Sequence, residues 1–352
     1  MEHEFESLDP QQQSDRLSIA VGRREALALA GKLGLGGAAL AALGSSMGAV
    51  PAFAAARSGA LGKHSYKFVL VNHVTTNPFF VPTKTGAQDA CDLLGCSYNW
   101  TGSTTSNVGE MVTAMQTAIA GSVDGIGVPM IDPKAFNAPT QNALKKGIPV
   151  VSYNADLQAS GRLAYIGQEL FASGVAMGQR IAAHVAPGSK LVLFIATPGS
   201  GNIQPRIDGA KSVLGSKYQV ATITTGADAN GERSAVEAYY VGHKDVKGMF
   251  AVDGGSTEGV ALTSKKYGLQ KKGVYTGGYD LVPGTVKAIR TGDMGFTIDQ
   301  QPYLQGFLPI LQLFFYKASN TLISPSDTNT GLKFVTNDNI KTYGVSSPFE
   351  GS

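Results

Sequence analysis

The chain has 352 residues, of which 43% are hydrophobic and 16% are charged, and its formal net charge is +3. This length predicts about two domains, and the composition is that of an ordinary globular protein with enough apolar residues for a sizeable core. Because the sequence has no basic block and no basic patch interleaved with aromatic residues, its charge provides no case for nucleic-acid binding.

Residues 1–56 are predicted to be an export signal rather than part of the fold. Arg23 and Arg24 precede an Ala-, Gly- and Leu-rich run without charge over residues 33–56, and residues 52–54 (Ala-Phe-Ala) fit a small-residue cleavage site. The arginine pair indicates a twin-arginine leader, although its neighbours depart from the usual pattern, so the Sec route is an alternative. An uncleaved membrane anchor is the other alternative, because the uncharged run is long enough to span a bilayer.

Two cysteines, Cys91 and Cys96, lie at the end of the first predicted helix and the start of the next strand. An oxidising export compartment permits a disulfide, and a short helix-to-strand turn can bring the two Cα atoms within range. Two buried thiols are the alternative. Two cysteines without nearby histidines make a poor metal site, and we expect neither a metal nor a cofactor.

From residue 66 onward, strand-like and helical patterns alternate. Strands are predicted at 67–72, 97–100, 125–128, 149–153, 191–195, 220–224, 248–252, 274–279 and 295–298. Helices are predicted at 79–94, 108–120, 133–146, 170–184, 205–214, 231–241, 257–267, 283–291 and 302–319. This alternation predicts an α/β fold with parallel sheets and right-handed crossovers. Nine strands exceed what one compact lobe needs, so a break is predicted near residues 156–162.

Motifs for catalysis are absent from the sequence. It contains no phosphate-binding loop, no His-Glu-x-x-His pair and no nucleophile elbow. We therefore assign no catalytic residue and do not expect an enzyme.

Polar residues recur directly after the predicted strands. They are Asn77, Asp132, Asn154, Asp156, Arg206, Asp228, Asp253, Asp280 and Gln300. Any one of them could be a helix cap or a turn residue, but ligands of open α/β sheets bind outside the carboxyl ends of the strands. Their recurrence therefore predicts a shared cleft. Carboxylates, amides and an arginine suit neighbouring hydroxyl groups, and the rings of Phe79 and Phe80 suit apolar C–H faces.

With these residues in view, the chain resembles the type I periplasmic binding proteins of the ribose-binding family, the solute receptors of ABC importers for simple sugars. The resemblance covers about residues 67–333. Its most specific segments are 76–80 (TNPFF), 147–154 (GIPVVSYN), 205–209 (PRIDG), 249–253 (MFAVD), 278–280 (GYD) and 297–302 (TIDQQP).

The resemblance implies two lobes, each a parallel sheet with helices on both faces, joined by a hinge of three crossings. The implied first lobe consists of residues 62–168 plus 301–324. The implied second lobe consists of residues 169–300 plus 325–352. The crossings are expected near residues 167–168, near 299–300 and after Ser319.

The resemblance also implies that Asn77, Phe79, Phe80, Arg206, Asp253, Asp280 and Gln300 bind the ligand. With Asn154 and Asp156, which follow the fourth predicted strand, the predicted ligand-binding set has nine residues. The chain departs from the family at Ala155, where an arginine is common, and at Ala229, where a ring-stacking phenylalanine is common. We therefore expect a neutral monosaccharide or sugar alcohol.

The implied activity is that of an extracytoplasmic receptor whose lobes close over the ligand and then dock on ABC transporter permease subunits. It is expected to act as a monomer without nucleic acid. The alternative is a sugar or quorum-signal receptor that presents its ligand to a chemoreceptor or sensor kinase. A repressor of the same fold is excluded because the Ala- and Gly-rich run at residues 33–56 cannot supply a polar recognition helix.

Overall fold

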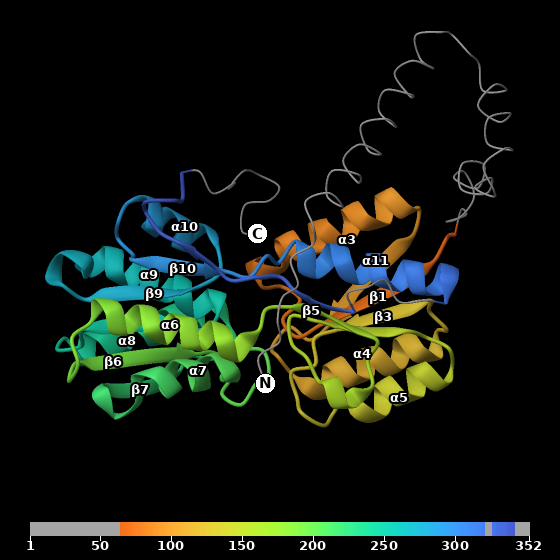
Figure 1. Ribbon diagram of the computed structural model, residues 1–352, viewed down its shortest axis with the longest axis horizontal. Helices are drawn as coiled ribbons and strands as arrows, with labels where there is room; N and C mark the ends of the chain where they lie inside the picture. The colour runs from red at the N-terminus through yellow and green to blue at the C-terminus, as the bar shows by residue number, and fades with distance from the viewer. Residues whose placement is uncertain (1–63, 321–325, 342–352) are drawn as a thin grey trace, which may run out of the picture. The chain divides into compact units, whose positions relative to one another are not determined.

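The computed structural model describes residues 64–320 and 326–341, which contain two sheets with helices on both faces of each (Figure 1). The predicted export signal at residues 1–56 lies outside the described part. Within the described part, no helix is both long and apolar enough to cross a membrane. The predicted α/β class is confirmed, because nearly all neighbouring strands are parallel and successive strands are connected through helices.

The first lobe is built on a sheet with the strand order β11-β5-β4-β3-β1-β2, parallel throughout. Its strands are β1 (Lys67–Asn72), β2 (Ser97–Gly102), β3 (Gly125–Val128), β4 (Val150–Tyr153), β5 (Ala164–Gly167) and β11 (Asp327–Asn329). Its helices are α3 (Val81–Leu94), α4 (Val108–Ala120), α5 (Asn137–Lys145) and α11 (Leu304–Ser319). Helices α3 and α11 cover one face of this sheet, and α4 and α5 cover the other (Figure 1).

The continuous apolar run of β1 follows from this two-sided burial. Phe68 and Leu70 belong to the core cluster under α3 and α11, whereas Val69 and Val71 belong to the cluster under α4 and α5. Successive side chains of a strand point to opposite faces, so a sheet covered on both sides needs apolar residues at every position.

Glycines allow α3 and α11 to pack closely although they are far apart in the sequence. A Cβ atom added at Gly306 would lie 1.8 Å from the Thr83 carbonyl oxygen, and one added at Gly86 would lie 2.2 Å from the Tyr303 carbonyl oxygen. Both distances are too short for any side chain, so a substitution at either glycine would push the two helices apart. This packing places α11 in the first lobe, although it follows the strands of the second.

The second lobe is built on a sheet with the strand order β12-β10-β9-β8-β6-β7, in which only β12 is antiparallel to its neighbour. Its strands are β6 (Lys190–Ile195), β7 (Gln219–Thr224), β8 (Gly248–Ala251), β9 (Tyr275–Tyr279), β10 (Phe296–Asp299) and β12 (Lys333–Val335). Its helices are α6 (Leu170–His184), α7 (Gln204–Leu214), α8 (Ala229–Gly242), α9 (Gly254–Tyr267) and α10 (Pro283–Arg290). One core cluster joins the sheet to α6 and α7, and another joins it to α8, α9 and α10.

The chain passes between the two sheets three times, after β5, after β10 and after β11. The third crossing lies further along the chain than predicted, because residues 325–352 were all assigned to the second lobe. Strand β11 instead pairs with β5, with Asp327 opposite Tyr165. Strands β5, β11 and β12 were not predicted; they have only three or four residues each, too few to show a periodic pattern.

Cys91 and Cys96 are free thiols in the structure, so the predicted disulfide is not formed. Cys91 is buried at the end of α3, and Gly95 ends that helix with a left-handed φ of 72°. The pKa of Cys91 is raised, most strongly by a hydrogen bond with Cys96 and next by burial. This thiol is therefore protonated at neutral pH.

Candidate functional site

Polar and aromatic side chains from both lobes meet in one pocket at the carboxyl ends of the strands. We call it the central pocket. It is lined by His73, Asn77, Phe79, Phe80, Asn154, Asn202, Ile203, Arg206, Asp253, Gly254, Asp280 and Gln300. Eight of the nine ligand-binding residues that the sequence predicted are in this set, the exception being Asp156. Both lobes contribute, and Gln300 lies on the second crossing.

The first lobe supplies an aromatic wall to the central pocket. A short 3-10 helix, η2 (Pro78–Phe80), begins at Asn77, whose Oδ1 accepts from the Phe79 N–H at 2.9 Å. The rings of Phe79 and Phe80 are nearly perpendicular, with centroids 4.7 Å apart. Both also belong to the core cluster of the first lobe, so these rings form the pocket wall and fill the core at once.

Asn154 lies directly after β4 and has a positive φ of 64°. Its Nδ2 donates to Gln305 Oε1 at 3.1 Å and, more weakly, to Gln300 Oε1 at 3.4 Å. Its Oδ1 is buried and has no partner among the described residues. A left-handed backbone in a non-glycine residue is strained and is typical of functional sites, so the fold holds this amide in place at some cost.

Arg206 is 2% exposed, in the first turns of α7. Its Nη1 donates to the Val252 carbonyl oxygen at 2.8 Å and its Nη2 to Gln168 Oε1 at 3.1 Å. The guanidinium lies 4.1 Å from the centroid of the Tyr279 ring, within cation–π range. Its Nε has no partner among the described residues, so this fixed guanidinium retains one buried N–H for another molecule.

Two carboxylates of the second lobe line the pocket, and they have different hydrogen-bond partners. Asp253 caps α9, because its Oδ1 accepts from the Ser256 N–H and its Oδ2 from the Ala196 N–H, both at 2.9 Å. Asp280 follows β9 with a positive φ of 75° and accepts from Gln300 Nε2 at 2.7 Å. Burial raises the pKa of Asp280 to about 7, against the opposing effect of the Arg206 charge. Both oxygens of Asp253 thus accept from backbone N–H groups, whereas Asp280 accepts from a side-chain amide.

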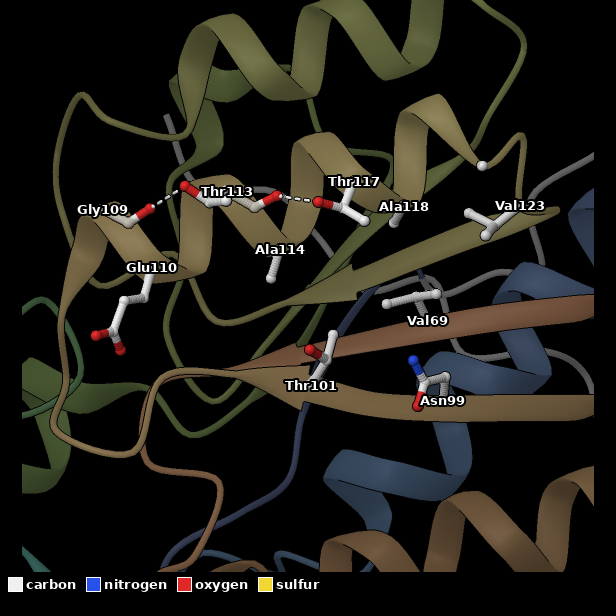
Figure 2. Close-up of a pocket in the computed structure, with 11 residues that line it drawn as sticks. Val69, Asn99, Thr101, Gly109, Glu110, Thr113, Ala114, Thr117, Ala118 and Val123 are labelled. Carbon is white, nitrogen blue, oxygen red and sulfur yellow. Dashed lines mark hydrogen bonds between the residues drawn. The ribbon is translucent and has the colours of Figure 1, made fainter.

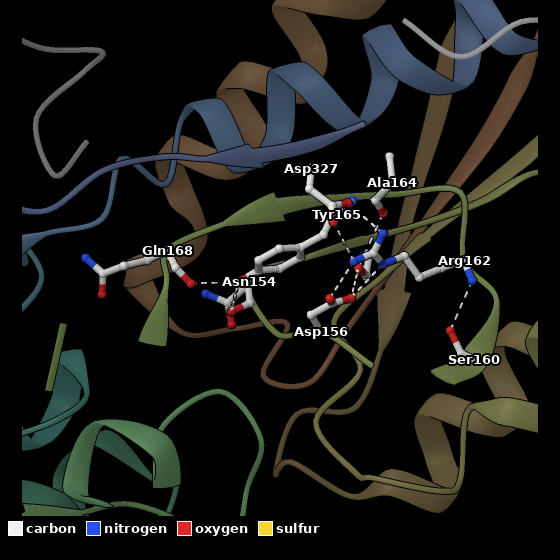
Figure 3. A network of polar contacts seen from close by, with 9 residues as sticks. Asn154, Asp156, Ser160, Arg162, Ala164, Tyr165, Gln168 and Asp327 are labelled. Atoms are coloured by element: carbon white, nitrogen blue, oxygen red, sulfur yellow. Dashed lines mark hydrogen bonds and ion pairs between the residues drawn. The ribbon is translucent and has the colours of Figure 1, made fainter. Parts of the chain in front are cut away.

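Asp156 does not line the central pocket, although it was predicted as a ligand-binding residue. Its carboxylate is bound by Arg162, through Nε at 2.8 Å and Nη2 at 2.6 Å, and it also accepts from Ser152 Oγ at 2.6 Å. Figure 3 shows this ion-pair cluster, in which Arg162 also reaches Asp327 of β11 at 2.6 Å. The cluster ties β11 to the first lobe beside the hinge.

Asp132 and Asp228 also follow predicted strands. They are a turn residue and a helix cap, the alternative interpretation given for such residues. Asp132 Oδ1 accepts from the Lys134 and Ala135 N–H groups at 2.8 and 2.7 Å. Asp228 Oδ2 accepts from the Gly231 N–H at 2.7 Å and caps α8. Neither aspartate lines the central pocket.

The sequence analysis missed His73 and Asn202. His73 comes directly after β1, so the criterion of a polar residue after a strand could have found it. Burial lowers the pKa of His73 to about 4, so the ring is neutral at neutral pH. Asn202 lies in the loop before α7, and no sequence signal points to it.

The two lobes touch beside the pocket. The Gly201 N–H donates to the Ile131 carbonyl oxygen at 2.7 Å, and Asn202 Nδ2 lies 3.1 Å from His73 Nε2. The pocket between them has a volume of only about 50 Å³. Ligand pockets are usually several hundred Å³, so a sugar-sized ligand needs the lobes to move apart before it can enter.

A larger hollow of about 640 Å³ lies between α4 and the edge of the first sheet (Figure 2). Two of its hydroxyls already have partners, because Thr113 Oγ1 and Thr117 Oγ1 each donate to a carbonyl oxygen one turn earlier, both at 2.9 Å. Glu110 is the only charged residue that lines it. Because this groove offers no buried polar atom without a partner, the central pocket is the better candidate site.

Among residues 64–320 and 326–341, no group of three or more His, Cys, Asp or Glu side chains has an arrangement that could hold a metal ion. The donor set of the central pocket consists instead of amides, one guanidinium, one imidazole and two carboxylates. Such a set binds hydroxyl groups through hydrogen bonds.

Comparison with known proteins agrees with this geometry. Residues 68–317 match the model of the periplasmic binding protein domain. A curated xylose/arabinose-binding protein from Sulfolobus acidocaldarius is 47% identical over 94% of this chain and 90% of the relative. A ribose import binding protein from Haemophilus influenzae is 27% identical over 67% of this chain and 80% of the relative.

A solved structure is similar as well. It is an ABC transporter solute-binding protein from Burkholderia graminis in complex with D-arabinose, with a TM-score of 0.74 and 26% identity over 80% of this chain and 98% of the other. The family match spans well over half of the sequence, and the first relative is similar over nearly its whole length. The chain therefore belongs to the periplasmic binding protein family.

Proposed function

We propose that this protein is the extracytoplasmic solute receptor of an ABC importer and that it binds a neutral monosaccharide or sugar alcohol in the central pocket. The observation that carries this proposal is the pair of buried atoms Asn154 Oδ1 and Arg206 Nε, neither of which has a partner in the described part of the chain. The first is an acceptor and the second a donor. A hydroxyl group can donate and accept, so neighbouring hydroxyls of one sugar satisfy both atoms.

The charges in the pocket favour a neutral ligand over an anion. The pocket has two carboxylates, Asp253 and Asp280, and one cation, Arg206; Asp280 and Arg206 are buried and Asp253 is half-buried. In a closed cleft of low dielectric, an added carboxylate or phosphate would be repelled by the two aspartates. The rings of Phe79 and Phe80 provide the apolar contact that the C–H face of a sugar needs.

Pentoses are the first candidates. The relative from Sulfolobus acidocaldarius is named a xylose/arabinose-binding protein, and the similar structure from Burkholderia graminis contains D-arabinose. These names support, for this chain, a small aldose without a charged substituent.

Hinge closure is the proposed mechanism, and Gln168 connects the pocket to it. Gln168 lies on the first crossing, accepts from Arg206 Nη2 at 3.1 Å and donates to the Gly331 carbonyl oxygen on the third crossing at 3.0 Å. Arg206 is thus linked to the first crossing by one hydrogen bond and to the third crossing by a second one, made by Gln168. The closed form would then present a changed rim to the permease subunits.

A ligand panel tests this function. Calorimetry and thermal unfolding with D-xylose, L-arabinose, D-ribose, xylitol and myo-inositol should reveal at least one neutral ligand that raises the melting temperature. Ribose 5-phosphate and a uronic acid serve as charged controls and should bind more weakly. Tighter binding of either anion than of every neutral compound would overturn the assignment.

The proposal includes export, and the protein is expected to act as a monomeric receptor without enzymatic activity and without nucleic acid. Residues 1–56 would direct export, by the twin-arginine or Sec route, and be removed. Intact-mass analysis of the exported protein should give an N-terminus near Ala55. A membrane-bound product that retains residues 1–54 would instead support the anchor alternative.

A further inference from the structure

We propose that His73 is a further ligand-binding residue, which donates its Nδ1–H to a ligand hydroxyl while its Nε2 accepts from Asn202 of the opposite lobe. This inference rests on the proposed function and adds a residue that senses the ligand and the closed lobes at once. Three steps lead to it: the ring is held in place, its tautomer is determined by Asn202, and its remaining nitrogen has no partner.

Hydrogen bonds fix the backbone around His73, and Phe80 packs against its ring. Asn72 Oδ1 accepts from the Val74 N–H at 2.9 Å and shapes the turn after β1. The His73 carbonyl oxygen accepts from the Ser106 N–H at 2.8 Å. The ring packs perpendicular to Phe80, with centroids 5.2 Å apart, and the residue is 6% exposed. The imidazole is therefore positioned by the fold before any ligand arrives.

Asn202 determines which nitrogen of the ring carries the proton. The Asn202 Oδ1 accepts from Ser200 Oγ at 2.5 Å, which turns its Nδ2 toward His73 Nε2 at 3.1 Å. An amide NH₂ can only donate, so Nε2 is the acceptor. Because burial keeps the ring neutral at neutral pH, the single proton is on Nδ1.

The Nδ1–H is then a buried donor without a partner among the described residues, in a side chain that lines the pocket. Leaving such a donor unpaired is unfavourable, and a ligand hydroxyl would pair it. With Asn154 Oδ1 and Arg206 Nε, the pocket then offers three unpartnered atoms, two donors and one acceptor, from both lobes. This pattern selects for the position of hydroxyl groups around the ligand rather than for its charge.

Two substitutions separate the two nitrogens. In His73→Asn, the side-chain amide can occupy the Nδ1 position and keep the donor, whereas in His73→Gln it reaches the Nε2 position and keeps only the contact with Asn202. Asn202→Ala removes the contact of His73 Nε2 with the opposite lobe and leaves the hydrogen bond between Gly201 and Ile131 in place. His243→Asn is the matched control, because His243 is exposed on the second lobe and stacks on Tyr239.

Dissociation constants for D-xylose and L-arabinose are the readout, with thermal unfolding of each ligand-free variant as the check on folding. We expect about a 10-fold loss of affinity in His73→Gln, the upper range for one neutral hydrogen bond, and less than about a 3-fold loss in His73→Asn, similar to Asn202→Ala. Equal losses in both His73 variants, or wild-type affinity in His73→Gln, would overturn the role of Nδ1.

Single-deoxy derivatives of D-xylose provide a readout that a merely structural histidine would not change. The wild type should bind one derivative much more weakly than it binds D-xylose. His73→Gln should bind that same derivative and D-xylose with about equal affinity. If every derivative loses the same factor in both proteins, the ligand contact is refuted. A wild-type protein that binds no sugar at all would count against the proposed function, whereas binding that is insensitive to His73 would count against this inference alone.

Discussion

The central pocket and the ion-pair cluster of Asp156, Arg162 and Asp327 both contain polar side chains beside the hinge, but their hydrogen bonding differs. In the cluster, the Nε, Nη1 and Nη2 atoms of Arg162 all donate to carboxylate oxygens (Figure 3). In the pocket, Arg206 keeps an unpartnered Nε. All three guanidinium nitrogens of Arg162 thus have hydrogen-bond partners, whereas one nitrogen of Arg206 has none among the described residues.

This difference distinguishes polar groups that stabilise the fold from polar groups that are available to a ligand. A polar group whose partners all come from the chain stabilises the fold, whereas a buried group without a partner lowers stability until another molecule supplies one. Position after a strand does not distinguish the two cases, which is why Asp156 was predicted with Asn154 although they have different roles. The predictions below test this distinction, from the largest expected effect to the smallest.

Arg206→Ala should weaken ligand binding by about 10- to 150-fold, because a charged hydrogen-bond donor contributes about 1.5–3 kcal/mol. Calorimetry with the best neutral ligand from the panel measures the change. Arg180→Ala is the matched control: Arg180 stacks on Phe296 and Phe334 in the second lobe and does not line the pocket. Unchanged affinity in Arg206→Ala would dismantle the site assignment.

Arg162→Ala should do the opposite, lowering the free energy of unfolding by about 2 kcal/mol while leaving affinity within a few fold. Its side chain is 6% exposed, but Asp327 is 49% exposed, so the loss should be below that of a fully buried pair. Chemical denaturation gives the stability. Lys190→Ala, which removes an exposed ion pair with Asp245, should leave the free energy of unfolding nearly unchanged, because solvent screens such pairs. A large loss of affinity in Arg162→Ala would merge the two regions into one site.

Asp280→Asn should flatten the pH dependence of stability in the ligand-free protein. The pKa of Asp280 is raised from 3.8 to about 7, so between these values the folded state binds more protons than the unfolded state. Its contribution to stability is therefore greatest below about pH 4 and is lost as the pH rises through 7. The variant should be more stable than the wild type by about 1–2 kcal/mol at pH 8 and nearly equal to it below about pH 4. Parallel pH profiles in the two proteins would contradict the burial of an incompletely compensated carboxylate.

Asn154→Ala and Asp156→Ala form the closest test of the comparison, because the two residues are neighbours in sequence. Asn154→Ala should weaken ligand binding by about 5-fold, the effect of one neutral hydrogen bond. Asp156→Ala should leave the dissociation constant unchanged and lower the melting temperature instead. The reverse pattern would restore Asp156 as a ligand-binding residue.

Local sequence patterns determined most of the architecture. Strand β1 at Lys67–Asn72 and helix α6 at Leu170–His184 have the predicted bounds, because a long apolar run and a sustained helical period are local properties. The resemblance to sugar receptors then placed Arg206 and Asp280 in one pocket, as motifs that follow strands must meet at one edge of a parallel sheet.

Only the tertiary structure decided which polar residues are free to bind. Arg162 and Asp327 are 165 residues apart, and their ion pair ties β11 to the first lobe, where β11 pairs with β5. His73 and Asn202 meet from opposite lobes, 129 residues apart. Whether a side chain has a partner depends on contacts between distant segments, and a single sequence contains no local signal of such pairing.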